Sequence, residues 1–243
     1  VQTLSDAQAI VRGPAGADQQ FSRNPDGTYA TLSEGSARLT LAGGKYTLTE
    51  ADGLVWQFRS DGLLEFVQDT NGNKVTCSYA TGRLTSLTHS NGSQLTLAYG
   101  ANGRISQVTE LNGAAPSDDR VTTFTYDASG QYLAGSTTPD NRTTGYTYQT
   151  TGTPASLHAL LSVTYPDDKP THFDYDEAGR LIRIGGEGDQ QTIAYTYGPR
   201  GTVTARDASG VAAVLRRGVF GHWSQAADAG TGNTLRLTYG DNG

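Results

Sequence analysis

Cysteine, methionine and proline are scarce in this sequence of 243 residues. The chain has no methionine and one cysteine, Cys77. A single cysteine cannot form an internal disulfide or a cysteine-based metal site. A lone cysteine on a strand is usually a small buried hydrophobe, and we expect this role for Cys77. The 8 prolines are too few for a collagen-like or polyproline chain.

Long apolar runs and basic patches are lacking as well. The longest apolar run, residues 211–215, is far shorter than the roughly 20 residues that a membrane-spanning helix needs. The net charge is −6 and Lys and Arg do not cluster, whereas a groove for nucleic acid needs concentrated positive charge. We therefore expect no nucleic-acid partner and no membrane span. The opening residues, Val1-Gln2-Thr3, do not resemble a signal peptide, and we expect a piece of a longer polypeptide.

Glycine, threonine and tyrosine are abundant instead. The chain has 31 glycines and 13 tyrosines. Thr and Tyr favour strands, and Gly supplies the positive φ that tight turns need. This composition predicts an all-β protein and argues against a helical bundle. Three segments have the pattern of a short helix, namely 5–11, 156–163 and 223–228.

Aromatic residues recur at nearly regular intervals along most of the chain. Successive anchor residues are 21, 20, 27, 22, 27 and 22 positions apart. The anchors are Phe58, Tyr79, Tyr99, Tyr126, Tyr148, Tyr175 and Tyr197. Most follow another ring by two residues, which places both rings on one face of a strand. A glycine comes three or four residues after each anchor, as in a hairpin turn, and Asn-Gly pairs mark second turns.

Two strands and two turns in each repeat predict an array of antiparallel β-hairpins. We expect this array over residues 46–210, preceded by a strand-rich segment, 1–45, that leads into the array or caps it. Residues 211–234 interrupt the period and are expected to form an irregular insertion, and residues 235–243 a truncated further repeat. Free edge strands invite pairing with other chains, so we expect segment 1–45 or the Trp223 segment to cap an edge.

The strongest local pattern for a metal or active site is His172-Phe173-Asp174-Tyr175-Asp176. Alternation along a strand places His172, Asp174 and Asp176 on one face, at spacings that a metal could bridge. The repeat already explains Phe173 and Tyr175 as the core face, so we favour a solvated face over a metal site.

Other candidates for chemistry are weaker. The pairs Asp118-Asp119 and Asp167-Asp168 are both expected in the extra loop length of the two 27-residue steps, where adjacent carboxylates rarely cooperate. The four histidines lie in different repeats, at 89, 158, 172 and 222. Segment 185–188 is glycine-rich, but no helix pattern follows it, which argues against a phosphate-binding loop. We expect no catalytic, cofactor-binding or metal-binding residues, and no enzyme.

Residues 124–130, Phe-Thr-Tyr-Asp-Ala-Ser-Gly, and 173–181, Phe-Asp-Tyr-Asp-Glu-Ala-Gly-Arg-Leu, resemble the tyrosine–aspartate (YD) repeats of Rhs proteins, toxin-complex BC shells and teneurins. The resemblance covers about residues 46–210. Gly100, Gln149 and Gly198 stand where the repeat has Asp. The resemblance implies an open segment of a long, curved, spiralling sheet, part of a shell that encloses a C-terminal toxin or effector.

The same resemblance implies the partners and the location. The partners would be the cargo toxin and adjoining repeats of the same polypeptide, in a protein that is secreted or on the cell surface. The family's Asp-Pro self-cleavage motif is absent from this sequence, so neither that site nor the toxin is expected here. The alternative is a surface adhesin or carbohydrate-binding module. Its exposed rings would be those outside the repeat pattern, namely Tyr29, Tyr132 and Trp223.

Overall fold

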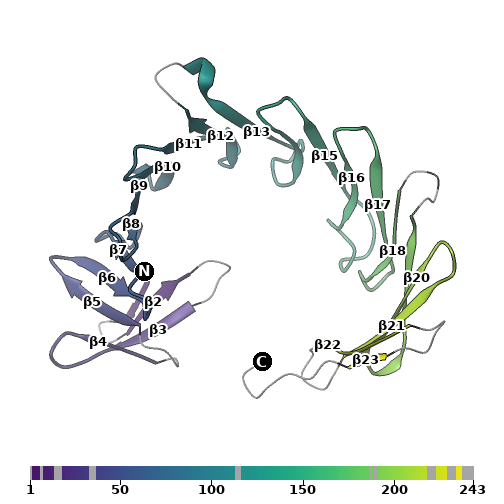
Figure 1. Ribbon diagram of the computed structural model, residues 1–243, viewed down its shortest axis with the longest axis horizontal. Helices are drawn as coiled ribbons and strands as arrows, with labels where there is room; N and C mark the ends of the chain where they lie inside the picture. Colours follow the sequence, from purple (N-terminus) through teal and green to yellow (C-terminus); the bar gives the residue numbers. More distant parts are fainter. Residues whose placement is uncertain are drawn as a thin grey trace. The chain divides into compact units, whose positions relative to one another are not determined.

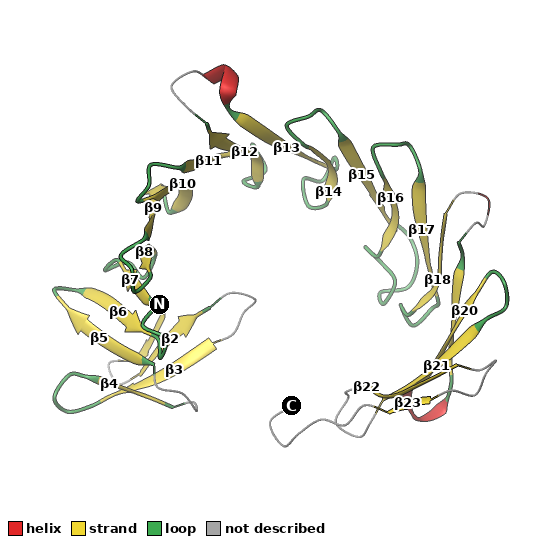
Figure 2. Cartoon of the chain, viewed as in Figure 1, coloured by secondary structure: helices red, strands yellow, loops and turns green. Residues whose placement is uncertain are grey.

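A computed structural model describes residues 2–5, 8–13, 18–32, 37–112, 116–186, 188, 191–217, 223–228 and 234–236. The chain divides into two compact units, residues 1–122 and 123–243. Strands dominate both units, and the predicted all-β class is confirmed (Figure 2). None of the helices in the described ranges is long and apolar enough to cross a membrane.

The first unit contains strands β1 to β12 and a 3₁₀ turn, η2 (Figure 1). Their bounds are β1 Gln2–Ser5, β2 Gln8–Arg12, β3 Asp18–Arg23, β4 Tyr29–Thr31, β5 Arg38–Ala42, β6 Lys45–Thr49, β7 Val55–Phe58, β8 Leu64–Gln68, β9 Lys74–Ala80, β10 Arg83–His89, β11 Gln94–Tyr99, β12 Ile105–Leu111 and η2 Pro116–Asp118.

The second unit contains β14 to β23, the larger part of β13 and a 3₁₀ turn, η4. Their bounds are β13 Arg120–Tyr126, β14 Leu133–Thr137, β15 Thr143–Tyr148, β16 Leu160–Thr164, β17 Pro170–Tyr175, β18 Leu181–Gly186, β19 Ile193–Tyr197, η4 Pro199–Gly201, β20 Thr202–Asp207, β21 Ala212–Arg217, β22 Trp223–Asp228 and β23 Thr234–Arg236.

Within each unit every strand pairs antiparallel with the next strand along the chain. The predicted array of antiparallel hairpins is therefore confirmed. The turn after β8 shows how the reversals close: Asp69 N–H donates to Asn73 O at 3.0 Å, and Gly72 N–H donates to Asp69 O at 3.2 Å. Gly72 adopts φ +84°, a conformation that favours glycine.

The best-buried core lies at the start of the chain and precedes most of the repeats. Strands β2 to β7 pack their inner faces together, and Phe21 and Leu39 are fully enclosed there. The cluster consists of Ala9, Val11, Phe21, Tyr29, Leu39, Leu48 and Phe58. In the later repeats the anchor tyrosines are only half-buried. The opening segment thus supplies the apolar core that the repeats lack.

The prediction of three short helices is wrong. Segment 5–11 contributes to β2, whose inner residues alternate with outer ones and pair with β3. Residues 160–163 belong to β16 and residues 223–228 form β22. Short apolar runs do not distinguish a helix from a strand by periodicity, and cross-strand pairing decides the outcome here.

The irregular insertion expected over residues 211–234 is also wrong. The described part of this range continues the array, because β21 pairs with β20 on one side and with β22 on the other. The segment lacks the tyrosines of the repeat but keeps the alternation of a strand, with Ala212 buried and Ala213 exposed. A break in the aromatic pattern therefore does not interrupt hydrogen-bonded pairing.

We expect the core of β2 to β7 to dominate the stability of the first unit. Leu39→Ala removes a fully buried side chain and is expected to lower the free energy of unfolding by about 2–5 kcal/mol. Leu32→Ala, a matched change at a side chain that is 55% exposed, is expected to cost about 1 kcal/mol or less. Urea denaturation followed by circular dichroism measures both, and equal losses would contradict this assignment of the core.

Candidate functional site: the junction between consecutive hairpins

Each of the first six anchor rings lies opposite a β-bulge. In the hairpin of β17 and β18, Asp174 pairs with Arg183 but Tyr175 pairs with Leu181, so Ile182 is the extra residue. The same shift occurs at the anchors Phe58, Tyr79, Tyr99, Tyr126 and Tyr148. A bulge bends the strand locally, increases its twist and takes one residue out of the ladder. The sequence pattern does not predict this feature.

The hydroxyl of an anchor tyrosine reaches back to the hairpin before it. In three repeats the phenol O–H donates to the backbone carbonyl of the leucine that faces the preceding anchor at its bulge. These hydrogen bonds join Tyr99 to Leu84 O at 2.8 Å, Tyr175 to Leu160 O at 3.0 Å and Tyr197 to Leu181 O at 2.7 Å. Burial raises the pKa of the Tyr175 hydroxyl, so this group keeps the proton that it donates. The hydroxyl thus ties consecutive hairpins together.

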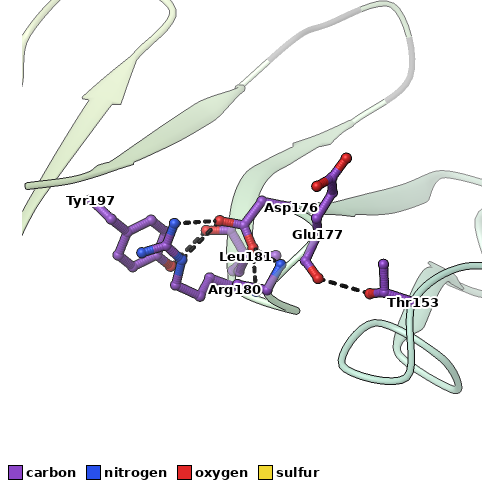
Figure 3. Close-up of polar contacts among 7 residues, drawn as sticks. Thr153, Asp176, Glu177, Arg180, Leu181 and Tyr197 are labelled. Atoms are coloured by element: carbon purple, nitrogen blue, oxygen red, sulfur yellow. Dashed lines mark hydrogen bonds and ion pairs between the residues drawn. The ribbon is translucent and has the colours of Figure 1, made fainter.

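An arginine in the turn or at the start of the return strand covers the next anchor ring. The Arg180 guanidinium lies 4.5 Å from the centre of the Tyr197 ring (Figure 3). Arg59 over Tyr79 and Arg83 over Tyr99 repeat the contact, each at 5.4 Å. A guanidinium at this distance is attracted by the negative face of the ring. Arginine and tyrosine therefore act as a pair across each of these junctions.

The aspartate after the tyrosine holds both the turn and the arginine. Asp176 Oδ1 accepts hydrogen bonds from the backbone N–H of Ala178 at 3.0 Å and of Arg180 at 2.9 Å. Asp176 Oδ2 accepts from Arg180 Nε at 2.8 Å and lies 2.7 Å from its Nη2 (Figure 3). The Arg180 side chain is the main reason that the pKa of Asp176 lies below its usual value. The carboxylate thereby orients the guanidinium toward Tyr197.

The turn after Tyr126 uses the same carboxylate position. Asp127 Oδ1 accepts from the backbone N–H of Gln131 and of Tyr132, both at 2.9 Å, and Oδ2 accepts from Ser129 Oγ at 2.6 Å. The Ser129 hydroxyl is the main cause that lowers the pKa of Asp127 to about 2. Where the repeat lacks this aspartate, other groups replace it in part: in the turn after Tyr99, Asn102 Oδ1 accepts from Arg104 N–H at 3.1 Å.

The long loop of residues 149–159 contacts the turns on both sides of it. Thr153 Oγ1 donates to Glu177 O at 2.8 Å, in the following turn (Figure 3). His158 stacks on Tyr132 of the preceding turn, with ring centres 4.9 Å apart and planes at 18°. The extra length of the second 27-residue step lies here, and its expected place around Asp167-Asp168 is wrong, because residues 165–169 form a tight turn between β16 and β17.

The structure does not bring His172, Asp174 and Asp176 together as a metal site. His172 is exposed, Asp174 forms an ion pair with Arg183 at 3.1 Å, and Asp176 serves the turn. Across the described ranges, no three His, Cys, Asp or Glu side chains are grouped to hold a metal ion. The residues that looked most like a site are thus used for turns and strand pairing.

The remaining candidates have separate local roles. Asp119 accepts from Asn112 N–H at 3.2 Å, and Asp167 lies 3.6 Å from Lys169. His89 Nδ1 accepts from Asn91 N–H at 3.1 Å, in the place of a turn aspartate. Cys77 is half-buried on β9, and burial raises the pKa of its thiol, which disfavours the reactive thiolate.

The glycine-rich segment and the rings that we expected to be exposed have structural roles where they are described. Gly185 lies in β18 and pairs with His172 of β17, so it belongs to a strand. His222, Glu187 and the side chain of Trp223 lie outside the described residues. Tyr29, which we expected to be exposed, is 8% exposed and belongs to the core, and Tyr132 is half-buried. The two described rings among the three candidates are therefore packed.

These junctions define a class of protein, namely an antiparallel sheet of bulged hairpins. Tyrosine hydroxyls bond to backbone carbonyls of the preceding hairpins, and aspartates stabilise the turns. The Teneurin YD-shell family model matches residues 64–195, which is more than half of the chain, and the chain belongs to this family of structural shell repeats. The resemblance inferred from the sequence is therefore confirmed. A comparison with curated proteins finds no match.

Solved structures share the fold. The chain is similar to the crystal structure of TcdB2-TccC3-TEV, with 15% identity and a TM-score of 0.58, over 94% of this chain and 14% of that chain. It is also similar to the crystal structure of TcdB2-TccC3 without its hypervariable C-terminal region, with 13% identity and a TM-score of 0.41, over 90% of this chain and 16% of that one. The chain thus spans a small part of these proteins, and the first likeness supports the fold alone.

We expect each junction hydroxyl to stabilise the sheet. Tyr99→Phe, Tyr175→Phe and Tyr197→Phe each remove one hydrogen bond and are expected to lower the free energy of unfolding by about 0.5–1.5 kcal/mol. Tyr165→Phe is the matched control, because this residue is 47% exposed, and its change is expected to stay within about 0.5 kcal/mol. Chemical denaturation measures all four, and four equal values would contradict the junction.

We expect the turn carboxylate of Asp127 to make stability depend on acid pH. Its pKa of about 2 lies below the value of about 3.9 in an unfolded chain, so the carboxylate form favours the folded state. This stabilisation is complete above about pH 4 and is lost as the pH falls toward 2.

Thermal melts between pH 6 and pH 2 measure this effect. Asp127→Asn is expected to show a smaller acid-induced fall in Tm than the wild type. Ser129→Ala, which removes the hydroxyl donor and keeps the backbone donors, is expected to lie between the two. An acid profile that is the same in all three proteins would show that Asp127 does not contribute.

Proposed function

We propose that this chain is a non-catalytic segment of the wall of a YD-repeat shell that encloses a C-terminal toxin or effector. Membership of a structural shell family supports the wall role. The partners in this proposal are the cargo and adjoining repeats of the same polypeptide. The protein would be secreted or on the surface of a cell, because its shell delivers or protects that cargo.

The use of the repeat's distinctive side chains is the observation that carries this proposal. An enzyme keeps its acids, bases and nucleophiles available to a substrate. Here the repeated tyrosine hydroxyls donate to backbone carbonyls, as Tyr197 does to Leu181. The repeated carboxylates accept from turn N–H groups, as Asp176 does from Ala178. Residues that connect hairpins in this way suit a wall.

Hydroxyl pairs across neighbouring strands also suit a wall. Thr147 and Ser162 lie 2.7 Å apart through their hydroxyl oxygens, and Thr137 and Thr143 lie 2.9 Å apart. Such pairs stabilise a sheet without a second layer of apolar residues over them. A single-layer sheet with a polar face is the form that a container wall needs.

A carbohydrate-binding or adhesive module is the second candidate. One open cavity of about 840 Å³ in the second unit is lined by Arg142, Tyr165, Asp167 and Lys169, a mixture of ring and polar groups that sugars use. The rings do not gather there, however, because Tyr29 and Tyr132 are packed elsewhere. We therefore rank this function below the wall.

Protease protection in the full-length polypeptide tests the proposed function. The C-terminal cargo is expected to resist trypsin when the repeats are intact. The double variant Tyr175→Ala with Arg180→Ala, which removes the hydrogen bond of one junction and the arginine–ring contact of the next, is expected to expose the cargo to cleavage, whereas Tyr165→Ala is not. Cargo that is cleaved equally fast in the wild type and the double variant would contradict enclosure. Binding on a glycan array that Tyr165→Ala abolishes would favour the second candidate instead.

A further inference from the structure

Six turns in the described ranges have an aspartate or asparagine followed by glycine at the same place. In each turn the glycine N–H donates to the carbonyl three residues before it, and the glycine has a positive φ between 76° and 96°. The glycines are Gly27, Gly53, Gly62, Gly72, Gly92 and Gly103. Asparagine is chemically labile, most of all before glycine, because no side chain shields the glycine nitrogen.

Five of these turns hold the side chain that precedes the glycine. Its oxygen accepts a hydrogen bond from the backbone N–H two residues further on. Asn91 Oδ1 accepts from Ser93 N–H at 2.9 Å, and Asn102 Oδ1 accepts from Arg104 N–H at 3.1 Å. The same contact is made by Asp26, Asp52 and Asp61. The side chain is thereby fixed against its own turn.

Asn71 lacks this contact. The N–H that would hold it belongs to Asn73, and that group donates to Asp69 Oδ1 at 2.9 Å. Asp69 Oδ1 also accepts from Asn71 N–H at 2.9 Å, and Asp69 Oδ2 accepts from Asn73 Nδ2 at 2.8 Å. Within the described part of the chain, the exposed side-chain amide of Asn71 has no hydrogen bond.

The aspartate at the first position of the turn causes this difference. An aspartate there accepts from the N–H four residues further on, and a backbone N–H is a single donor. Besides Asp69, this contact is made by Asp127, Asp176 and Asp207. The turns of Asn91 and Asn102 begin with His89 and Gly100, so their N–H groups stay available to the asparagines. The turn of Asn71 alone among the six combines the aspartate with an asparagine before glycine.

We propose that Asn71 is a site of spontaneous deamidation that reacts faster than Asn91 and Asn102. The Gly72 N–H loses its proton to hydroxide, and the nitrogen attacks Asn71 Cγ. The Cγ–Nδ2 bond breaks, and Nδ2 takes a proton from water and leaves as ammonia. One water molecule then opens the five-membered imide at either carbonyl, which leaves aspartate or isoaspartate at position 71. This site is independent of the wall function.

The turn has to open before the glycine nitrogen can attack. The bond from Gly72 N–H to Asp69 O measures 3.2 Å, whereas those of Gly92 and Gly103 both measure 2.9 Å. At Asn91 and Asn102 the hydrogen bond to the side-chain oxygen has to break as well. One further hydrogen bond of this kind corresponds to a rate difference of about fivefold.

Peptide mapping by mass spectrometry tests the proposal on the whole chain after incubation in mildly alkaline buffer. Trypsin yields peptides 60–74 and 84–104, and fragment ions separate Asn91 from Asn102. We expect Asn71 to deamidate about fivefold faster than either of them in the folded chain, and all three at similar rates in urea. A folded-state rate of Asn71 that does not exceed the other two would overturn the proposal. A fivefold difference that persists in urea would do so as well, because it would come from the local sequence.

Two exchanges of the first turn residue test its role. His89→Asp gives the turn of Asn91 the competing carboxylate and is expected to speed its deamidation by about fivefold. Asp69→Gly gives the turn of Asn71 the first residue of the Asn102 turn and is expected to slow its deamidation by a similar factor. Asn102 is the internal control in both variants. A weakened turn cannot explain the first result, because aspartate at this position adds hydrogen bonds to the turn. An unchanged rate of Asn91 in His89→Asp would contradict the proposed competition.

Discussion

A hairpin of about 21 residues buries too little apolar surface to be stable alone, so every repeat depends on its neighbours. In this chain the hydrogen bond from an anchor tyrosine to the carbonyl beside the preceding bulge meets that need. It joins Tyr99, Tyr175 and Tyr197 to the hairpins before them. At the Tyr197 junction, the arginine over the ring and the aspartate in the turn hold the same two hairpins in position. Stability of the array then accumulates junction by junction.

The two ends of the first unit are stabilised by different interactions. Strands β2 to β7 bury Phe21 and Leu39 completely, as a small globular core does. From β8 onward the anchor rings are only half-buried, and hydrogen bonds and ring contacts contribute more of the stability. The core thus gives the array a stable beginning.

The sequence predicted the hairpins because its signals are local. Ring spacing of two and glycine three or four residues later define a strand and its turn, as at Tyr175 and Gly179. The bulge was missed because it depends on the partner strand, where Leu181 and not Ile182 faces the ring. The carbonyl partner of each hydroxyl and the core around Phe21 depend on non-local packing in the same way. The strands within residues 211–234 were missed because pairing persists without tyrosine.

Detection of the tyrosine hydroxyl protons tests the central claim most directly. A phenol proton held by a carbonyl exchanges slowly with water, and its hydrogen bond is detectable through its scalar coupling to the carbonyl carbon. We predict slowly exchanging hydroxyl protons for Tyr99, Tyr175 and Tyr197 in nuclear magnetic resonance spectra. These protons are expected to couple to the carbonyl carbons of Leu84, Leu160 and Leu181, respectively. Hydroxyl protons that exchange as fast as that of exposed Tyr165 would contradict the account.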